Sequence, residues 1–568
     1  MERARVLVVG LDGATFTLMR PLLAAGRLPT LARLTQEGAS GPLRTIIPPH
    51  TAAAWTSMMT GINPGGHGVT GFEQIALRDY GCRGELATSR LLAGRTWFDL
   101  LGERGLRVAA IRVPMTYPAW PVNGVMVSGY PSPSRGGHHT WPRALAESIP
   151  PPDELPASNS PDERLDVLLR EVDITAQITL NTLQADAYDL CMVVFQQTDQ
   201  AHHFFWQYIE PSSPAYSAAD AAAYGGHIAQ VYERIDAALA RILDAAAPRL
   251  ALVVSDHGGA PSPRHEVHLN AWLAEQGLLA ARDANRSLAQ RLYDYRHVVL
   301  SRARRLGLRK QLERLLPRRA RGYMEQFILN VTQVDWARTQ VYRFPLPELT
   351  EGLAINLRGR QPRGIVAVGA EYHALRERLM RALPALRTPD GEQLITGLWR
   401  REELFSGPHA GDWPDIILRL HPDFQAGKEA SVPLFTPVPL QAFERHSGTH
   451  DLDGILLAHG AGVRAGAALE GAGLLDIAPT VFHALGVPVP DHFEGAIPCG
   501  LLADAPGGAD APARRNGAAK HAPAAPVPVA AWAEGATPAA VPAIGAAGEL
   551  SPEDENSIRE RLRALGYL

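Results

Sequence analysis

Two short apolar runs of the chain lead directly into residues of the kinds that bind metal ions. Residues 6–10 (VLVVG) lead into Asp12, and residues 250–255 (LALVVS) lead into Asp256 and His257. Carboxylate oxygens and imidazole nitrogens are ligands of zinc and similar divalent ions. Two glycines follow His257, and we expect them to leave room for the close approach of a metal.

Two further segments supply a hydroxyl and another acid–imidazole pair. Thr51 follows two prolines in PPHTAAAW, where a helix is expected to begin; the free N–H groups and positive dipole of a helix N-terminus stabilise a phosphate or an alkoxide. Asp199 and His203 in TDQAHHFFW are four residues apart, so on a helix they project from one face toward one ion. Taken alone, an Asp-Gly after a strand is usually a turn, a Thr before a helix is usually a cap, and each Asp–His pair is more often structural than metal-binding. Their joint occurrence predicts a hydrolytic metal site with Thr51 as nucleophile.

The elements that position these residues alternate along the first half of the chain. Alternation of buried strands with helices predicts a doubly wound α/β fold, with a mostly parallel central sheet flanked by helices. Ligands bind at the carboxyl ends of the strands in such sheets, where the candidate residues lie. The expected strands are residues 6–10, 108–113, 190–195 and 250–255, and the expected helices are residues 29–38, 96–105, 162–185 and 226–246.

Composition divides the chain into five regions. The predicted regions are the first part of the catalytic core (1–278), an arginine-rich helical insert (279–338), the second part of the core (339–502), an Ala/Pro/Gly-rich flexible linker (503–548) and a C-terminal helix (549–568). Strands are expected at 352–357, 415–420 and 454–458, and a helix at 476–486. The last helix has Ser551 as its expected N-cap and docks either on its own core or on a partner.

Bulk properties narrow the class of protein. A formal net charge of −4 gives no general attraction to a nucleic acid polymer or to an anionic membrane. The three cysteines are far apart, and we find neither a signal peptide nor an apolar run long enough for a transmembrane segment. We therefore expect a cytoplasmic enzyme or binding protein. The small phosphorylated substrate is expected from the helix N-terminus at Thr51 and not from these bulk properties. The arginine-rich insert is expected to be a solvated cap or packing helix; the alternative is a surface that attracts anionic substrate or lipid, with peripheral membrane contact.

The order and the residues of these segments resemble those of the alkaline phosphatase superfamily, specifically its type I phosphodiesterase and nucleotide pyrophosphatase branch. The matching segments are VLVVGLDGA, PPHTAAAWTSMMTGINPGGHGV, TDQAHHFFW, VVSDHGG, SGTHDLDGILLAHG and LLDIAPTVFHALGVPVPDHFEG, spread over most of residues 5–500. The resemblance implies an alkaline phosphatase-like fold and two divalent metal ions, usually zinc, with manganese as the alternative. It places Asp199, His203 and His450 on one ion, and Asp12, Asp256, His257 and the Thr51 oxygen on the other.

His450 is assigned as a metal ligand through the resemblance alone, because composition and spacing do not distinguish it from other histidines. Its competitors do not match the ligand positions of the family, and we expect structural or supporting roles for them. They are His50, His67, His202, His446 and His459.

The chemistry implied by the resemblance is in-line attack of Thr51 on phosphorus, giving a covalent phosphothreonine that water then hydrolyses. The segment T-A-A-A-W differs from the C-x-P-x-R of sulfatases, so sulfate ester hydrolysis is not expected. Nucleotide pyrophosphatases usually carry a phosphate-binding asparagine downstream of the threonine, whereas residues 69–74 (VTGFEQ) contain none. Arg95, Arg358 or Arg360 could take its place, although a structural role is favoured for each.

Three functions remain compatible with the sequence. The leading one is a metal-dependent phosphohydrolase acting on a phosphodiester or phosphomonoester. A phosphotransferase would use the same threonine with an alcohol acceptor, and a non-catalytic metal-binding scaffold would keep only the fold.

Overall fold

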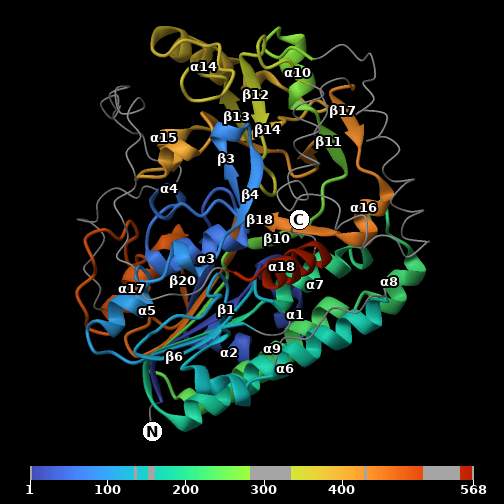
Figure 1. Ribbon diagram of the computed structural model, residues 1–568. Coiled ribbons are helices and arrows are strands. Elements are labelled where there is room, and N and C mark those ends of the chain that lie inside the picture. The colour runs from blue at the N-terminus through green and yellow to red at the C-terminus, as the bar shows by residue number, and fades with distance from the viewer. Residues whose placement is uncertain are drawn as a thin grey trace.

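The computed structural model describes residues 3–133, 137–150, 160–281, 334–427, 432–502 and 550–565. Two layers of helices enclose a large mixed sheet, and a smaller lobe lies above the carboxyl edge of that sheet (Figure 1). Most of the predicted insert (279–338) and the predicted linker (503–548) fall outside the described residues, so these two predictions stay predictions.

The central sheet is mostly parallel. In spatial order its strands are β20 (Ala467–Ala468), β2 (Ala39–Arg44), β19 (Asp453–Gly460), β9 (Leu250–Val254), β1 (Ala4–Leu11), β8 (Tyr188–Phe195), β5 (Val108–Val113), β6 (Gly124–Ser128) and β7 (Thr140–Trp141), and β21 (Ala472–Gly473) pairs with β2. β19 and β7 run antiparallel to their neighbours, whereas β9, β1, β8, β5 and β6 are parallel. These five strands therefore end at one edge of the sheet.

The central strands are continuously apolar because helices cover both faces of the sheet. α2 (Pro29–Glu37), α6 (Pro161–Ala185) and α9 (His227–Ala246) pack together on one side, and α3 (Thr51–Thr60), α5 (Trp97–Gly102) and α17 (Ile477–Ala484) pack together on the other (Figure 1). Other helices of this part of the chain are α1 (Phe16–Ala24), α4 (Pro64–His67), α7 (Gln197–Phe205), α8 (Ala218–Tyr224) and α16 (Leu440–Arg445). The predicted doubly wound α/β fold is confirmed.

The smaller lobe has its own antiparallel sheet and its own hydrophobic cluster. The sheet has the order β12 (Val341–Phe344), β13 (Thr350–Ile355), β15 (Ile416–Leu420) and β14 (Ile395–Arg400), with α10 (Leu269–Glu275), α14 (Ala370–Ala382) and α15 (Arg401–Leu404) beside it. The strands expected at 352–357 and 415–420 therefore exist but belong to this lobe. Residues 454–458, by contrast, form part of β19 in the central sheet.

Three short ladders connect the lobe to the central sheet. They are β3 (Glu73–Ala76) with β4 (Cys82–Leu86), β10 (Gly258–Pro261) with β18 (Gly448–Asp451), and β11 (His265–Val267) with β16 (Phe424–Ala426) and β17 (Phe435–Pro437). The antiparallel β10–β18 ladder pairs Gly259 with His450, and thereby carries a distant histidine to the end of β9.

The C-terminal helix α18 (Pro552–Ala564) packs on the core of the same chain, near α7 (Figure 1). The Ser551 side chain accepts a hydrogen bond from the Asp554 N–H, as predicted for the N-cap. Ile558, Leu562 and Leu565 are buried in the main hydrophobic cluster. Within the described part of the chain, none of the helices has the length and apolarity required to cross a bilayer.

Candidate metal centre

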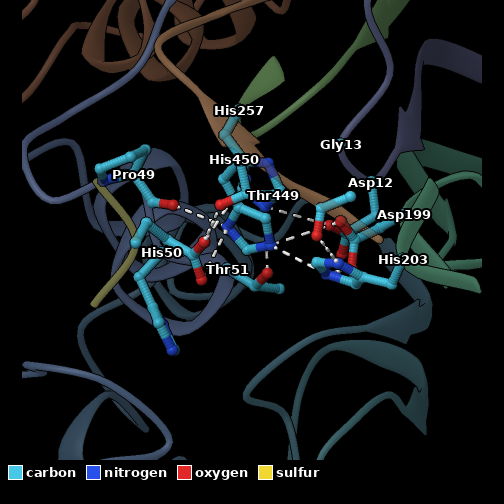
Figure 2. A network of polar contacts seen from close by, with 12 residues as sticks. Asp12, Gly13, Pro49, His50, Thr51, Asp199, His203, His257, Thr449 and His450 are labelled. Atoms are coloured by element: carbon cyan, nitrogen blue, oxygen red, sulfur yellow. Dashed lines mark hydrogen bonds and ion pairs between the residues drawn. The ribbon is translucent and has the colours of Figure 1, made fainter. Parts of the chain in front are cut away.

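The carboxyl edge of the central sheet gathers the predicted residues into one buried cluster (Figure 2). Asp12 follows β1, Asp256 and His257 follow β9, and α7, which carries Asp199 and His203, follows β8. Thr51 is the first residue of α3, where a helix was predicted to begin, and His450 lies on β18. Every one of these side chains is buried.

Two groups of side chains have the geometry of metal sites. Asp12, Asp256 and His257 form one group, and Asp199, His257 and His450 form the other, with all ligand atoms in a group within 4.8 Å of one another. His203 adjoins the second group, because its Nε2 atom lies 3.2 Å from Asp199 Oδ2 and 3.2 Å from His450 Nε2. His257 belongs to both groups, whereas the resemblance assigned it to the Asp12 and Asp256 ion alone.

The three histidines present the same ring nitrogen to the centre. The Nδ1 atoms of His203, His257 and His450 lie 2.8–2.9 Å from the backbone carbonyl oxygens of Gly448, Gly258 and Pro49. A carbonyl oxygen only accepts, so each Nδ1 donates to its carbonyl, and each Nε2 atom is directed toward the other groups of the centre. This is the arrangement in which an imidazole binds a metal while a backbone partner fixes its orientation.

The carboxylates are crowded and incompletely paired. Oδ1 of Asp12 and Oδ2 of Asp256 are buried and accept no hydrogen bond from any residue that the structure describes. Burial raises the pKa of both groups, and the negative charge of Asp199 raises both further, as that of Asp256 does for Asp12. Burial also acts to raise the pKa of Asp199, but His203 and His450 outweigh it, and the net shift is downward. Bound cations would supply the positive charge that this cluster lacks, so the residues present fit two metal ions.

Thr51 faces the same centre from the N-terminus of α3. Its Oγ1 atom lies 3.1 Å from His257 Nε2, and every residue of α3 is buried. The preceding residue, His50, caps the helix, because its Nδ1 accepts a hydrogen bond from the Ala52 N–H at 3.2 Å. The hydroxyl is therefore held where it can touch an ion bound by Asp12, Asp256 and His257.

Two glycines permit the close packing around Asp12. A Cβ atom on Gly10 would lie 2.4 Å from the Trp55 ring, and one on Gly13 would lie 2.8 Å from Asp199 Oδ1. The Trp55 indole N–H donates to Asp12 Oδ2 at 3.0 Å. Trp55 was not among the predicted site residues, although its position four residues after Thr51 on a helix was a usable signal.

The glycines after His257 have a different role from the predicted one. A Cβ atom on Gly258 would lie 2.3 Å from the Asp453 carbonyl oxygen, and one on Gly259 would lie 2.5 Å from the His202 ring. The space beside them is thus filled by protein and not left for a metal, so that prediction is wrong. The glycines permit β10 to pack closely against β19 and α7.

Glu348 is a further neighbour of the centre that the sequence did not indicate. Its Oε2 atom accepts from Thr449 Oγ1 at 2.8 Å and from the His450 N–H at 3.4 Å, and Oε1 lies 3.6 Å from His450 Nδ1. The residue has a positive φ of 60°, a conformation that is uncommon outside glycine. No local pattern around Glu348 pointed to a site.

None of the competing histidines belongs to the two metal-site groups, although His446 borders one of them. Its ring stacks on that of His203, with the centroids 3.7 Å apart, so it borders the centre. The others bond elsewhere: His50 to the Ala52 N–H, His67 to Ser57 and Val69, His202 to Tyr232, and His459 to Glu37.

The arginines proposed as phosphate contacts are held elsewhere or exposed. Arg360 makes a two-pronged ion pair with Asp415 at 2.6–2.7 Å, Arg95 donates to the Gly66 carbonyl at 3.3 Å, and Arg358 is exposed. The loop of residues 69–74 does border the site, since the Phe72 ring lies 5.0 Å from the His50 ring.

The chain is similar to known proteins over most of its length. A family model described as type I phosphodiesterase / nucleotide pyrophosphatase matches residues 6–453. Among solved structures, phosphonoacetate hydrolase from Sinorhizobium meliloti 1021 in complex with phosphonoformate is similar, with 16% sequence identity, a TM-score of 0.49, and coverage of 86% of this chain and 96% of that chain. Human ectonucleotide pyrophosphatase / phosphodiesterase 5 is similar with 12% identity, a TM-score of 0.43 and the same coverage of 86% and 96%. No curated protein matches the chain in sequence.

Proposed function

The chain belongs to the type I phosphodiesterase / nucleotide pyrophosphatase family of hydrolases, and on that premise we propose that it cleaves a phosphodiester or phosphomonoester through a covalent phosphothreonine on Thr51. One observation carries the proposal. The Nε2 atoms of three backbone-anchored histidines, three buried carboxylates and the Thr51 hydroxyl converge at the carboxyl edge of one sheet.

Two divalent ions would be held by this cluster. Asp199, His203 and His450 would hold one, and Asp12, Asp256, His257 and the Thr51 oxygen would hold the other, with zinc as the favoured metal and manganese as the alternative. When bound, such ions lower the pKa of a coordinated hydroxyl and offset negative charge on phosphate oxygens.

The protein residues have separate tasks in this reaction. Thr51 Oγ1 forms the bond to phosphorus while the bond to the leaving oxygen breaks, and water later releases the phosphoryl group from Thr51. The N-terminus of α3 would present its positive dipole to the phosphate oxygens of a bound substrate. Trp55 holds Asp12 in place, and Glu348 holds the backbone of His450.

Hydrolysis of bis-p-nitrophenyl phosphate and p-nitrophenyl phosphate tests the proposal. We expect EDTA to abolish turnover of the preferred compound and zinc to restore it. Thr51→Ala should lower kcat by about 10³-fold or more while both ions still bind, because the variant loses the nucleophile. Thr56→Ala is the matched control, since Thr56 is buried on the same helix and donates its hydroxyl to the Ala52 carbonyl at 2.7 Å.

Three results would contradict the proposal. They are equal loss of activity in both variants, full activity of Thr51→Ala, and absence of turnover in the zinc-loaded wild type. Adding an alcohol acceptor separates hydrolysis from transfer, because a transferase would release p-nitrophenol only in its presence.

A further inference from the structure

A cavity of about 240 Å³ lies between the C-terminal helix α18 and the carboxyl edge of the central sheet. Val194 and Gln196 at the end of β8, Arg112 of β5 and Tyr130 after β6 line one side, and Arg561 of α18 lines another. Since β5, β6 and β8 run parallel to β1, the cavity lies at the same edge of the sheet as Asp12.

Three glutamines are among the polar residues that line this cavity. Gln196, Gln197 and Gln200 all line it, and none of their side-chain amides is hydrogen-bonded to another residue in the described part of the chain. Gln197 is only 6% exposed, and its buried Oε1 atom accepts from no donor among the described residues. A buried amide without a partner costs free energy, so a bound group that supplies the missing hydrogen bonds would be stabilised.

The chemistry of the lining selects a particular kind of ligand. A side-chain amide both donates and accepts, and so matches a hydroxyl, which does the same; a phosphate only accepts. Arg112 and Arg561 are balanced in formal charge by Glu171 and Glu560, so the lining carries no net charge to attract an ion. The volume is below that of common drug-sized pockets, roughly 300–1,000 Å³, and suits a group of monosaccharide size.

The cavity and the metal centre share helix α7. Gln197 and Gln200 line the cavity, while Asp199 and His203 of the same helix face the metal centre. Tyr130 connects the two sides: its ring lies 5.3 Å from the Phe72 ring, and the Phe72 ring lies 5.0 Å from that of His50, the residue before Thr51. A phosphate at the metal centre could therefore carry a substituent that enters the cavity.

We propose that this cavity binds a neutral, hydroxyl-rich group, a sugar or a cyclitol, esterified to the phosphate that the metal centre cleaves. The proposal deepens the proposed function and rests on it for the phosphate end of the substrate. α18 supplies one wall, so the C-terminal helix is part of the substrate site.

Binding to the full-length, zinc-loaded Thr51→Ala protein tests this, because that variant binds a substrate without consuming it. Calorimetric titration would compare myo-inositol 1-phosphate with inorganic phosphate and with phosphocholine. We expect myo-inositol 1-phosphate to bind about tenfold more tightly than either, because neutral hydrogen bonds each contribute roughly two- to tenfold in affinity. Adding Gln200→Leu should reduce that preference to about threefold or less, whereas Gln230→Leu, at an exposed position of α9, should leave it intact.

A second measurement separates failure of the cavity from failure of the phosphate site. Saturation-transfer NMR with free myo-inositol should show contact with the protein, and a Gln196→Leu/Gln200→Leu variant should lose it. Equal affinity for the three phosphates, tighter binding of phosphocholine, or an inositol signal unchanged in the double variant would overturn the cavity proposal. Failure of inorganic phosphate to bind, with the inositol signal present, would instead overturn the proposed function.

Discussion

Replacing Trp55 with phenylalanine would remove one indole N–H from the metal centre and keep an aromatic ring in its place. That N–H donates to Asp12 Oδ2 at 3.0 Å, and Trp55 is fully buried. A hydrogen bond to a charged group contributes about 1.5–3 kcal/mol. The bond favours the ionised form of Asp12, whose pKa burial and neighbouring carboxylates raise, so its loss raises that pKa further.

The expected effect is weaker binding of one metal ion. Binding requires an ionised Asp12, so a higher pKa makes the ion compete with a proton. A loss of about 1.5–3 kcal/mol corresponds to roughly 10- to 150-fold in affinity, near the 10- to 100-fold cost that is usual for a residue supporting a metal ligand. Competition with a fluorescent zinc chelator at two pH values measures it, and the loss should diminish as pH rises.

Trp97→Phe is the matched control. Trp97 is also fully buried in the main hydrophobic cluster, but its Nε1 atom has no hydrogen-bond partner among the described residues. Both variants create a similar cavity, so both should lose thermal stability, whereas only Trp55→Phe should weaken one of two zinc-binding steps. Equal zinc affinity in the two variants would refute the assignment of Asp12 as a metal ligand supported by Trp55.

Two further predictions concern the docked helix and a buried histidine. Leu562 of α18 is fully buried, so Leu562→Ala should destabilise the docking of α18 by about 2–5 kcal/mol. The variant should be cleaved faster by trypsin near the C-terminus, whereas Asn556→Ala, at an exposed position of the same helix, should not. Equal cleavage rates in the two variants would contradict the docking. Burial lowers the pKa of His67 to about 3, with Arg95 as the next cause. As the pH falls, the unfolded chain therefore takes up a proton on His67 before the folded chain does. The free energy of unfolding should decrease as the pH drops from about 6.5 toward 3, and His67 contributes up to about 1.4 kcal/mol per pH unit to this decrease. His67→Gln should flatten that slope in urea titrations at successive pH values, and an unchanged slope would refute the assignment.

The sequence predicted the elements that are buried on both faces. The run before Asp12 is apolar without alternation because helices cover both sides of β1, and the same holds for β9 before Asp256. Each strand ends where polar residues begin, so the carboxyl edge and its acidic residues were both predictable. Thr51 was predictable because two prolines stop the preceding segment and α3 starts two residues after the second of them.

Contacts between segments distant in sequence were not predictable from local pattern. Strands β13 and β15 resemble core strands in composition, but they pair in a separate antiparallel sheet, and apolar runs do not specify their partners. His450 reaches the centre through its pairing with Gly259, and Glu348 through contacts with Thr449 and His450. The spacing of residues within each segment carries no signal for such pairings.

The orientation of the metal-binding histidines links these distant segments. His203 of α7 donates to the Gly448 carbonyl, two residues before His450 on β18. His450 in turn donates to the Pro49 carbonyl, two residues before Thr51. The tautomer of each imidazole is thus fixed by the backbone that positions the next functional residue. A shift of β18 would therefore turn both rings and move the start of α3, so the orientation of the Thr51 hydroxyl depends on the same backbone contacts that aim His203 and His450.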